Sequence, residues 1–509
     1  MRTGTLGFCL WLLHTSAMPA AMAVDVTASE TPAQGPVALY DRALAQAGEG
    51  QLDEAMATLA AAVEAGYRDV FALRGAPALA PLRERECWAG LMTAFEAHNP
   101  WLRILDTDDS QPHYPWLGYA AGWNALQNGS APIAERVSGP AVAGVFGQFQ
   151  SQAAAMLGDY DYAHANYFGG LRRGDAAEYG ITGVQPALPQ LAALVEGRQV
   201  VMLNESHGHS NQRAANFLFV RELRKLGFTH LALETLGYDR VEGDGCRSSV
   251  LADENLPARG HAVRATGYYT NDPIYAELLR MALAEGYVPV AYDHTLPDPR
   301  SPQREQEQAR NIACVLERDP DARIVVIGGG SHTSKQPGAD GQPGMMGARL
   351  KALLSTEPLS IANYTVALQG LPDSPAATGY QNPTRDGPLA GQPYFADTAE
   401  GHYTVPGYDR VAFLPVPAAR SPEAGWLRLG GWRVPAPAVP LACPKAPCLL
   451  EARRVGEGAD AIPGDRCVIE AAGGTCTLFL APGDYEAILL DAAGASSAAS
   501  HRLAVAAGG

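Results

Sequence analysis

The chain has 509 residues, too many for a single hydrophobic core, so we expect about three domains. It carries 54 acidic and 38 basic residues, which gives a formal net charge of −16 at pH 7. An acidic chain without a long basic stripe argues against a protein that binds nucleic acid or an anionic membrane surface.

The first 23 residues have the pattern of a secretory signal peptide. Arg2 precedes a short apolar run, Phe8–Leu13, and Ala21-Met22-Ala23 follows as a small-x-small cleavage site. The apolar run is too short to cross a bilayer, and no later segment offers about 20 uninterrupted apolar residues. We therefore expect an exported protein, periplasmic or extracellular, without a membrane span. Residues 24–36 are small and polar and are predicted to be a disordered lead-in.

Four of the eight cysteines crowd into a short C-terminal stretch. In an oxidising compartment this crowding predicts two disulfides. Of the three connectivities that four cysteines allow, we favour Cys443–Cys448 with Cys467–Cys476. Cys9 leaves with the signal peptide. An odd number then remains, so we expect at least one free or intermolecular thiol among Cys87, Cys246 and Cys314.

Residues 37–196 have a helical pattern. Leu44–Ala55 predicts a helix, a short turn and a second helix, and small residues such as Ala43 and Ala47 would let the two helices pack closely. The segment resembles a tetratricopeptide-type (TPR-like) hairpin, and a second hairpin of this kind is predicted at Ala153–Ala163. Such a helical region could bind a protein partner.

Residues 197–370 alternate short β-branched runs with longer helical patterns. The predicted strands are Gln199–Leu203, His230–Glu234, Val288–Tyr292 and Arg323–Ile327. The predicted helices are Ala214–Leu226, Ile274–Ala284 and Glu305–Leu316. Apolar strands separated by helices are typical of an α/β domain with a mainly parallel sheet.

Residues 371–425 are rich in Pro, Gly and Asp and are predicted to be a loop-rich extension. Residues 426–509 contain short alternating strands and the crowded cysteines, which predicts a small disulfide-stapled β-sandwich with an accessory role. The strands expected there are Leu427–Leu429, Cys467–Ile469, Cys476–Leu480 and Tyr485–Leu490. The predicted fold is therefore multidomain: a TPR-like helical N-terminal region, a central α/β domain and a C-terminal β-sandwich.

Charged and polar side chains follow three of the predicted α/β strands where each strand ends. Glu205 and His207 follow the first strand, Glu234 ends the second, and His332 follows the fourth after glycines 328–330. Ligands of open α/β sheets bind outside the carboxyl ends of the strands. Alternate residues of an extended chain point to the same side, so Glu205 and His207 can converge on one ligand. The glycines let the backbone turn sharply and approach a substrate closely.

These motifs carry a family resemblance. Leu203–Gly208 followed by Gly227–Thr235 resembles the ChaN-like and erythromycin-esterase-like group, which is more distantly similar to the TraB/Tiki proteins. These families share a Gly-Glu-x-His-type motif, a Glu that ends the next strand, an Arg-Glu segment that opens a later helix, and a Gly-x-x-His motif. Arg304-Glu305 matches the third element and Gly329–His332 the fourth, whereas Asn204 stands where the group often has Gly.

A further segment, Gly267–Pro273, resembles secreted members of the group that have no assigned activity. The resemblance covers the α/β region, with four motifs in order, and implies an α/β fold with an active pocket.

The resemblance also implies a role for each matched residue. His207 would be the general base that activates water, with Glu205 and Glu234 orienting it or holding a metal, and His332 would be a second acid or base. Arg213 or Arg304 would bind an anionic group or stabilise an oxyanion. Members of the group differ in metal use. Glu205, His207, Glu234 and His332 could together hold Zn²⁺ or Mn²⁺.

Two other chemistries are disfavoured by the sequence. The glycines at 328–330, with Lys335 downstream, lack the Gly-Lys-Ser/Thr ending of a phosphate-binding loop. Neither Ser206 nor Ser331 lies in a Gly-x-Ser-x-Gly nucleophile elbow. Water activation therefore ranks above serine-nucleophile catalysis.

We thus expect an exported hydrolase that activates water on an ester, amide or related bond of a small molecule or peptide. One alternative is a ChaN-like uptake protein that binds haem or a metal, in which Tyr268, Tyr269 and Tyr292, taken as exposed, would be ligands together with the histidines. A second alternative is a non-catalytic interaction module.

Overall fold

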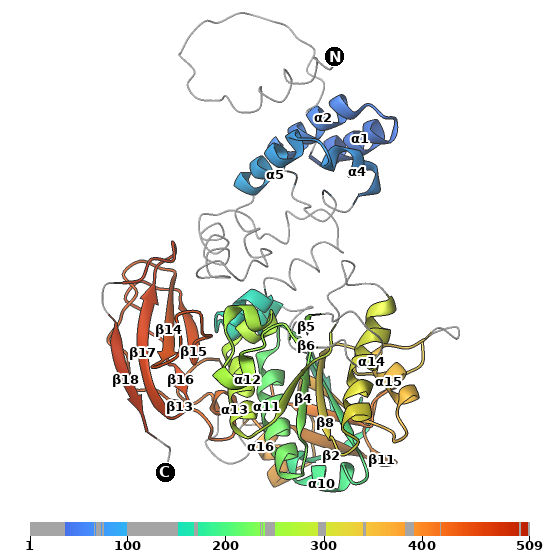
Figure 1. Ribbon diagram of the computed structural model, residues 1–509. Coiled ribbons are helices and arrows are strands. Elements are labelled where there is room, and N and C mark those ends of the chain that lie inside the picture. The colour runs from blue at the N-terminus through green and yellow to red at the C-terminus, as the bar shows by residue number, and fades with distance from the viewer. Residues whose placement is uncertain are drawn as a thin grey trace, which may run out of the picture. The chain divides into compact units, whose positions relative to one another are not determined.

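The computed structural model describes residues 36–65, 67, 73, 76–98, 151–166, 172–234, 236, 238–239, 250–293, 302–338, 343–381, 391–417, 419–497 and 500–506 (Figure 1). The chain forms two compact units, which contain the described helices before residue 99 and the described residues from 151 on. The predicted signal peptide, nearly all of the lead-in and residues 99–150 of the predicted helical region lie outside the described residues.

The first unit is helical. Its elements are α1 (Pro36–Gly48), α2 (Leu52–Glu64), η2 (Pro77–Leu79), α4 (Ala80–Arg83) and α5 (Cys87–His98). Gly50 makes the turn between α1 and α2 with a φ of 79°, and Ala43 and Ala55 are completely buried, so the predicted helical hairpin is confirmed. A tetratricopeptide array is not confirmed. The second predicted hairpin belongs to the other unit, where it comprises helical residues 151–156 and α9 (Tyr160–Asn166).

The second unit contains a ten-stranded sheet. Its strands are β1 (Arg172–Asp175), β2 (Ile181–Pro186), β3 (Val200–Glu205), β4 (His230–Leu233), β7 (Val288–Ala291), β8 (Ile324–Gly329), β9 (Leu359–Gln369), β10 (Tyr394–Thr398), β11 (Gly401–His402) and β12 (Arg410–Leu414). The main order is β11-β10-β12-β9-β3-β8-β4-β7, with β1 beside β9 and β2 beside β10. The run from β12 to β7 is parallel, which confirms the α/β prediction.

Helices cover both faces of the parallel strands, as the alternation of buried side chains shows. Val201 and Leu203 of β3 lie in the hydrophobic cluster that contains α11 (Ser210–Lys225) and α13 (Pro273–Ala284). Val200 and Met202 lie in the cluster of α14 (Pro302–Arg318) and α15 (Met346–Leu353). The sheet is thus the middle layer of an α/β/α arrangement (Figure 1).

The sheet is wider than the sequence predicted. Residues 172–186 were expected to be helical and residues 371–425 to be loops, but they supply β1, β2, β10, β11 and β12, together with α16 (Pro375–Gln381). These strands are short. β1 reads Arg-Arg-Gly-Asp and buries no apolar run, so its pairing with β9 depends on a distant partner rather than on local pattern. Smaller elements of this region are η5 (Leu188–Gln190), α10 (Leu191–Leu194), β5 (Tyr238–Asp239), β6 (Val250–Leu251), α12 (Leu256–Arg259), η7 (Arg264–Thr266) and η8 (Tyr269–Asn271).

The C-terminal region forms two antiparallel sheets. One has the order β15 (Asp465–Ile469), β14 (Cys448–Arg454), β17 (Gly483–Leu490), β18 (His501–Val505), and the other pairs β13 (Val434–Pro435) with β16 (Phe479–Leu480). They share one hydrophobic cluster. The expected strand Leu427–Leu429 is wrong: Leu427 and Arg428 end η10 (Gly425–Arg428) and Leu429 caps it, because Trp426, Leu427 and Leu429 pack into the α/β core.

The predicted disulfides are confirmed: Cys443 pairs with Cys448 and Cys467 with Cys476. Cys314 is also disulfide-bonded, and Cys87 keeps a free thiol. Among the helices that the structure describes, none is both long enough and apolar enough to cross a bilayer.

Candidate functional site

The strand order brings the predicted site residues together. β8 lies between β3 and β4, and the three strands run parallel. Glu205 at the end of β3 is paired with Gly329 of β8, and the amide of Glu234, just after β4, donates to the carbonyl of Ile327. His332 follows β8 after one tight turn, with its amide bonded to the carbonyl of Gly329. Residues 127 positions apart in sequence therefore share one sheet edge.

His207 is held by a carboxylate on one ring nitrogen. Its Nδ1 lies 3.0 Å from Oε1 of Glu205, which orients the ring and leaves Nε2 directed away from this pair. The ring of Tyr269 stacks on the imidazole at a centroid distance of 4.0 Å. His207 is 8% exposed and Glu205 1%, so both side chains of the pair are buried.

Arg213 of α11 binds the carboxylate of Glu205. Its Nε and one terminal nitrogen donate to the Glu205 carboxylate at 3.1 to 3.3 Å, and its other terminal nitrogen donates to Oδ2 of Asp272 at 2.8 Å. Burial raises the pKa of Glu205, but the charge of Arg213 and the hydrogen bond of His207 outweigh it, so the pKa lies below its ordinary value. Glu205 is therefore an ionised partner for His207.

Glu234 lies between the two imidazoles. Its Oε1 accepts a hydrogen bond from Arg304 at 2.9 Å and is 3.8 Å from Nε2 of His332, while its Oε2 accepts the amide of Gly329. Burial raises the pKa of Glu234, but the charges of His332, His207 and Arg304 together hold it below its ordinary value.

His332 faces two carboxylates. Its Nδ1 lies 2.7 Å from Oε1 of Glu305, and its Nε2 faces Glu234. Burial lowers the pKa of His332, but these two acidic groups outweigh burial and raise it above its ordinary value. Glu305 is fixed in turn by the amide of Met346, which donates to its other oxygen at 2.6 Å. His332 is thus suited to carry a proton near neutral pH.

Gly329 lies against both His207 and Glu234. A Cβ at this position would lie 2.3 Å from Nε2 of His207 and 3.0 Å from Oε2 of Glu234. Nε2 of His207 and the carboxylate of Glu234 therefore lie next to the same backbone atom. Any side chain at Gly329 would enter the space between them.

Both arginines are bonded to carboxylates of the site. Arg213 is completely buried against Glu205 and Asp272. Arg304 donates to Asp293 at 2.6 and 2.8 Å as well as to Glu234. Their guanidinium groups neutralise site carboxylates, and Arg213, which is completely buried, has no surface for a substrate group. The predicted anion-binding role stays a prediction for Arg304.

The arrangement does not fit a divalent metal. All four oxygens of Glu205 and Glu234 accept hydrogen bonds from Arg213, His207, Arg304 or the Gly329 amide. Within the described ranges, no three His, Cys, Asp or Glu side chains are grouped so that they could hold a metal ion. We therefore derive no step through Zn²⁺ or Mn²⁺.

Tyr292 was predicted to be an exposed ligand in the haem alternative, and this is wrong. Its side chain is completely buried and its hydroxyl donates to the carbonyl of Ile327 at 2.9 Å. Tyr268 and Tyr269 are half-buried beside the site.

The sequence analysis assigned no site role to three acidic residues: Asp272, Asp293 and Glu305. Asp272 stands directly before Pro273 at the start of a helix, which is a capping signal, and its Oδ1 indeed accepts the amide of Ile274 at 2.7 Å. That signal predicts a cap but gives no hint of the bond to Arg213. Glu305 lies in the Arg-Glu motif of the resemblance, which gave no role to the Glu, and Asp293 carries no comparable local pattern.

The comparisons with known proteins give no family. No family model and no curated protein matches the chain. Similar solved structures include RRSP, a MARTX toxin effector domain from Vibrio vulnificus CMCP6, with 18% identity and a TM-score of 0.24 over 58% of this chain. This chain spans 58% of the length of that one.

A structure described as bacterial protein toxins has 14% identity and a TM-score of 0.25, covering 65% of this chain and 94% of that one. The C-terminal region of Pasteurella multocida toxin is described as having a thiol-protease-like catalytic triad. It has 10% identity and a TM-score of 0.24, and the match covers 71% of this chain and 54% of that one. At these scores the likenesses carry no argument about function.

Proposed function

We propose that the protein is an exported hydrolase of the ChaN-like and erythromycin-esterase-like kind, which activates water on an ester or amide bond. The observation that carries the proposal is the pairing of His207 with Glu205, which holds Nδ1 and directs Nε2 toward Gly329 and Glu234. A histidine held in one tautomer by a carboxylate is the usual arrangement of a general base. Export is supported by the signal-like N-terminus and by the two paired disulfides.

In the proposed reaction, water lies near Nε2 of His207 and gives a proton to that nitrogen as its oxygen adds to the carbonyl carbon of the substrate. The protonated His332 then gives a proton to the departing oxygen or nitrogen as the carbonyl–heteroatom bond breaks. The proton on His207 returns through solvent to His332, so each turnover consumes one water and releases an acid and an alcohol or amine. The raised pKa of His332 suits the acid role.

The arginines act on this reaction indirectly. Arg213 keeps Glu205 ionised and in place, and Arg304 does the same for Glu234. A small molecule or a peptide remains the substrate class, and a neutral or cationic group near the site fits the surrounding carboxylates better than an anionic one.

The test compares purified wild type with His207→Gln and Glu205→Gln on a panel of chromogenic esters and fluorogenic peptides, in buffer with a chelator. His402→Gln is the matched control, because His402 is an exposed histidine that is likewise paired with a carboxylate, Asp397, at 2.9 Å. We expect His207→Gln to lower kcat/KM by about 10³-fold, within the range for loss of a general base, and His402→Gln to leave it unchanged.

Product formed in ¹⁸O-labelled water should carry one label in the new carboxylate. Wild type that turns over no substrate class, together with a Soret shift when haemin is added that His332→Ala abolishes, would overturn the hydrolase proposal in favour of haem binding.

A further inference from the structure

Residues 262–273, which we call the bridging segment, touch the proposed site at two points. Tyr269 stacks on the ring of His207 at a centroid distance of 4.0 Å. Asp272 accepts a hydrogen bond from Arg213 at 2.8 Å, and Arg213 holds Glu205. The bridging segment therefore fixes His207 both directly, through the stacked ring, and indirectly, through the Asp272–Arg213–Glu205 chain.

The bridging segment is also firmly bonded within itself. The side-chain amide of Asn271 donates to the carbonyls of Gly267 and Tyr268 at 3.1 and 3.2 Å, and the hydroxyl of Thr270 donates to Gly267 at 2.7 Å. Asn271, Thr270 and Asp272 have no exposed surface. A displacement at one end of this turn is therefore passed on to Tyr269 and Asp272 rather than absorbed within it.

The other side of the bridging segment is bonded to the C-terminal region. Main-chain hydrogen bonds of 3.0 Å run from Ile462 to the carbonyl of Ala262 and from Arg264 to the carbonyl of Asp460. One terminal nitrogen of Arg433, which is completely buried, donates to the carbonyls of Pro273 and Gly464 at 2.8 and 2.7 Å.

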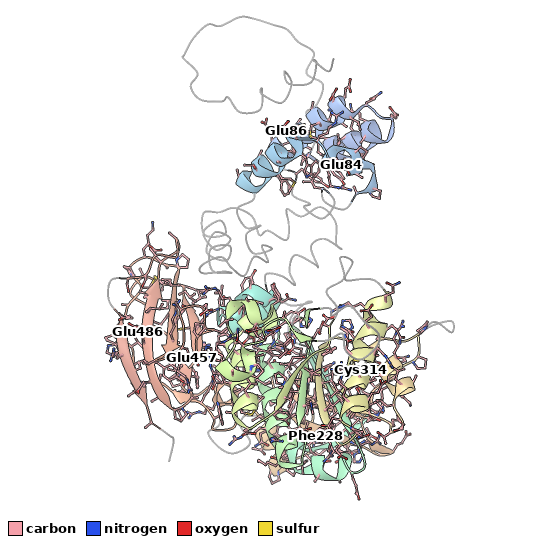
Figure 2. All side chains as sticks on the ribbon, in the orientation of Figure 1. Glu84, Glu86, Phe228, Cys314, Glu457 and Glu486 are labelled. Atoms are coloured by element: carbon pink, nitrogen blue, oxygen red, sulfur yellow. A yellow bond between two sulfur atoms is a disulfide. The ribbon has the colours of Figure 1, made fainter. Side chains whose placement is uncertain are left out.

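Further contacts strengthen this junction. Arg466 of β15 donates to the carbonyl of Asn271 at 3.4 Å. Glu457, labelled in Figure 2 on the side of the C-terminal sheet that faces α13, binds Arg280 of α13 at 2.6 and 2.9 Å. Arg433 makes its junction bonds through one terminal nitrogen, while its Nε and other terminal nitrogen are buried without a hydrogen-bond partner among the described residues. Breaking hydrogen bonds of a buried charged group is costly, so these bonds argue for a fixed contact.

We propose that the C-terminal region, residues 429–506, is part of the catalytic unit: it holds the bridging segment, and through Tyr269 and Asp272 it sets the orientation of His207. Asp272 and Tyr269 are positioning residues in this account, and Arg433 couples the C-terminal sheets to them. In this proposal the region that the sequence predicted to be accessory has a structural role at the site. The effect on the orientation of His207 can be measured without any enzymatic activity. Only the expected change in kcat rests on the proposed function.

The test uses full-length protein labelled with ¹⁵N-histidine, in which the tautomer of His207 is followed by NMR and its signal is assigned with His207→Gln. Arg433→Met removes both carbonyl contacts at the junction. Arg323→Met is the control, since one terminal nitrogen of Arg323 also donates to two carbonyls, of Val195 and Arg198 at 3.1 and 3.2 Å, at the amino ends of the strands away from the site. Its Nε and other terminal nitrogen donate to the carbonyls of Arg198 and Leu226 as well, so this substitution removes more hydrogen bonds than Arg433→Met does.

We expect Arg433→Met and Asp272→Asn to turn the single-tautomer NMR signal of His207 into the signal of a tautomer mixture. Arg323→Met should leave the signal unchanged, even where it lowers the melting temperature as much as Arg433→Met does. On any substrate that wild type turns over, Arg433→Met should lower kcat about tenfold relative to Arg323→Met, with KM within about twofold. If Arg433→Met does not fold, Arg433→Lys takes its place, because it keeps the charge but reaches only one carbonyl.

A folded Arg433 variant with an unchanged His207 signal overturns the coupling. A changed signal in a protein that hydrolyses nothing leaves the coupling in place and rejects only the hydrolase, so the two proposals fail separately.

Discussion

Substituting Gly329 by alanine should disable the site through sterics alone. The added Cβ would lie 2.3 Å from Nε2 and 2.4 Å from Cε1 of His207, whereas ordinary contact begins at 3.4 Å. The ring must therefore move by about 1 Å, and Tyr269 blocks one face of it. A misplacement of about 1 Å can cost about 100-fold in rate, which corresponds to about 2.7 kcal/mol of transition-state stabilisation.

Gly183→Ala is the matched control, because Gly183 lies on β2 of the same sheet and an added Cβ meets nothing within 4 Å. The assay is kcat/KM of both variants and wild type on the best substrate of the panel, with melting temperatures measured in parallel. We expect the Gly329 variant to lose about 100-fold and the Gly183 variant to match wild type. A folded Gly329→Ala protein within twofold of the control would refute the placement of His207 Nε2 in the reaction.

Three further predictions follow from the charges and the disulfides. Glu234→Gln removes an acidic group that raises the pKa of His332, so the alkaline limb of the kcat/KM profile, where the proton donor is lost, should move to lower pH. Glu205 has a lowered pKa when folded, so it stabilises the fold above its unfolded pKa of about 4.3 and this contribution is lost as the pH falls through the folded value. Calorimetry should accordingly show a steeper loss of melting temperature on acidification for wild type than for Glu205→Gln. Replacing Cys443 and Cys448 by serine should cost about 2 kcal/mol of unfolding free energy in urea titrations, since the bond closes a short loop with a sequence separation of 5.

Much of the α/β domain could be predicted because its central strands are buried on both faces. Every side chain of β3 and β8 is buried, and such β-branched runs stand out from the amphipathic helices between them. The residues that follow these strands could therefore be assigned to one edge of the sheet.

The partners of those residues could not be predicted. Asp272 reaches Arg213 only because α13 packs against α11. Glu305 reaches His332 only because α14 shares a hydrophobic cluster with β8. These contacts depend on helix placement, which no local pattern encodes. The same holds for Arg213 and Arg304: a sequence shows that an arginine is present but not that buried carboxylates already surround it.

The central claim is that His207 and His332 belong to one active site, and a double-mutant cycle tests this claim most directly. We would measure kcat/KM for wild type, His207→Gln, His332→Gln and the double variant on the same substrate. Because residues that act as a unit in one active site are strongly non-additive, we expect kcat/KM of the double variant to lie within about tenfold of that of the less active single variant. Losses that multiply across the two substitutions would contradict a shared site.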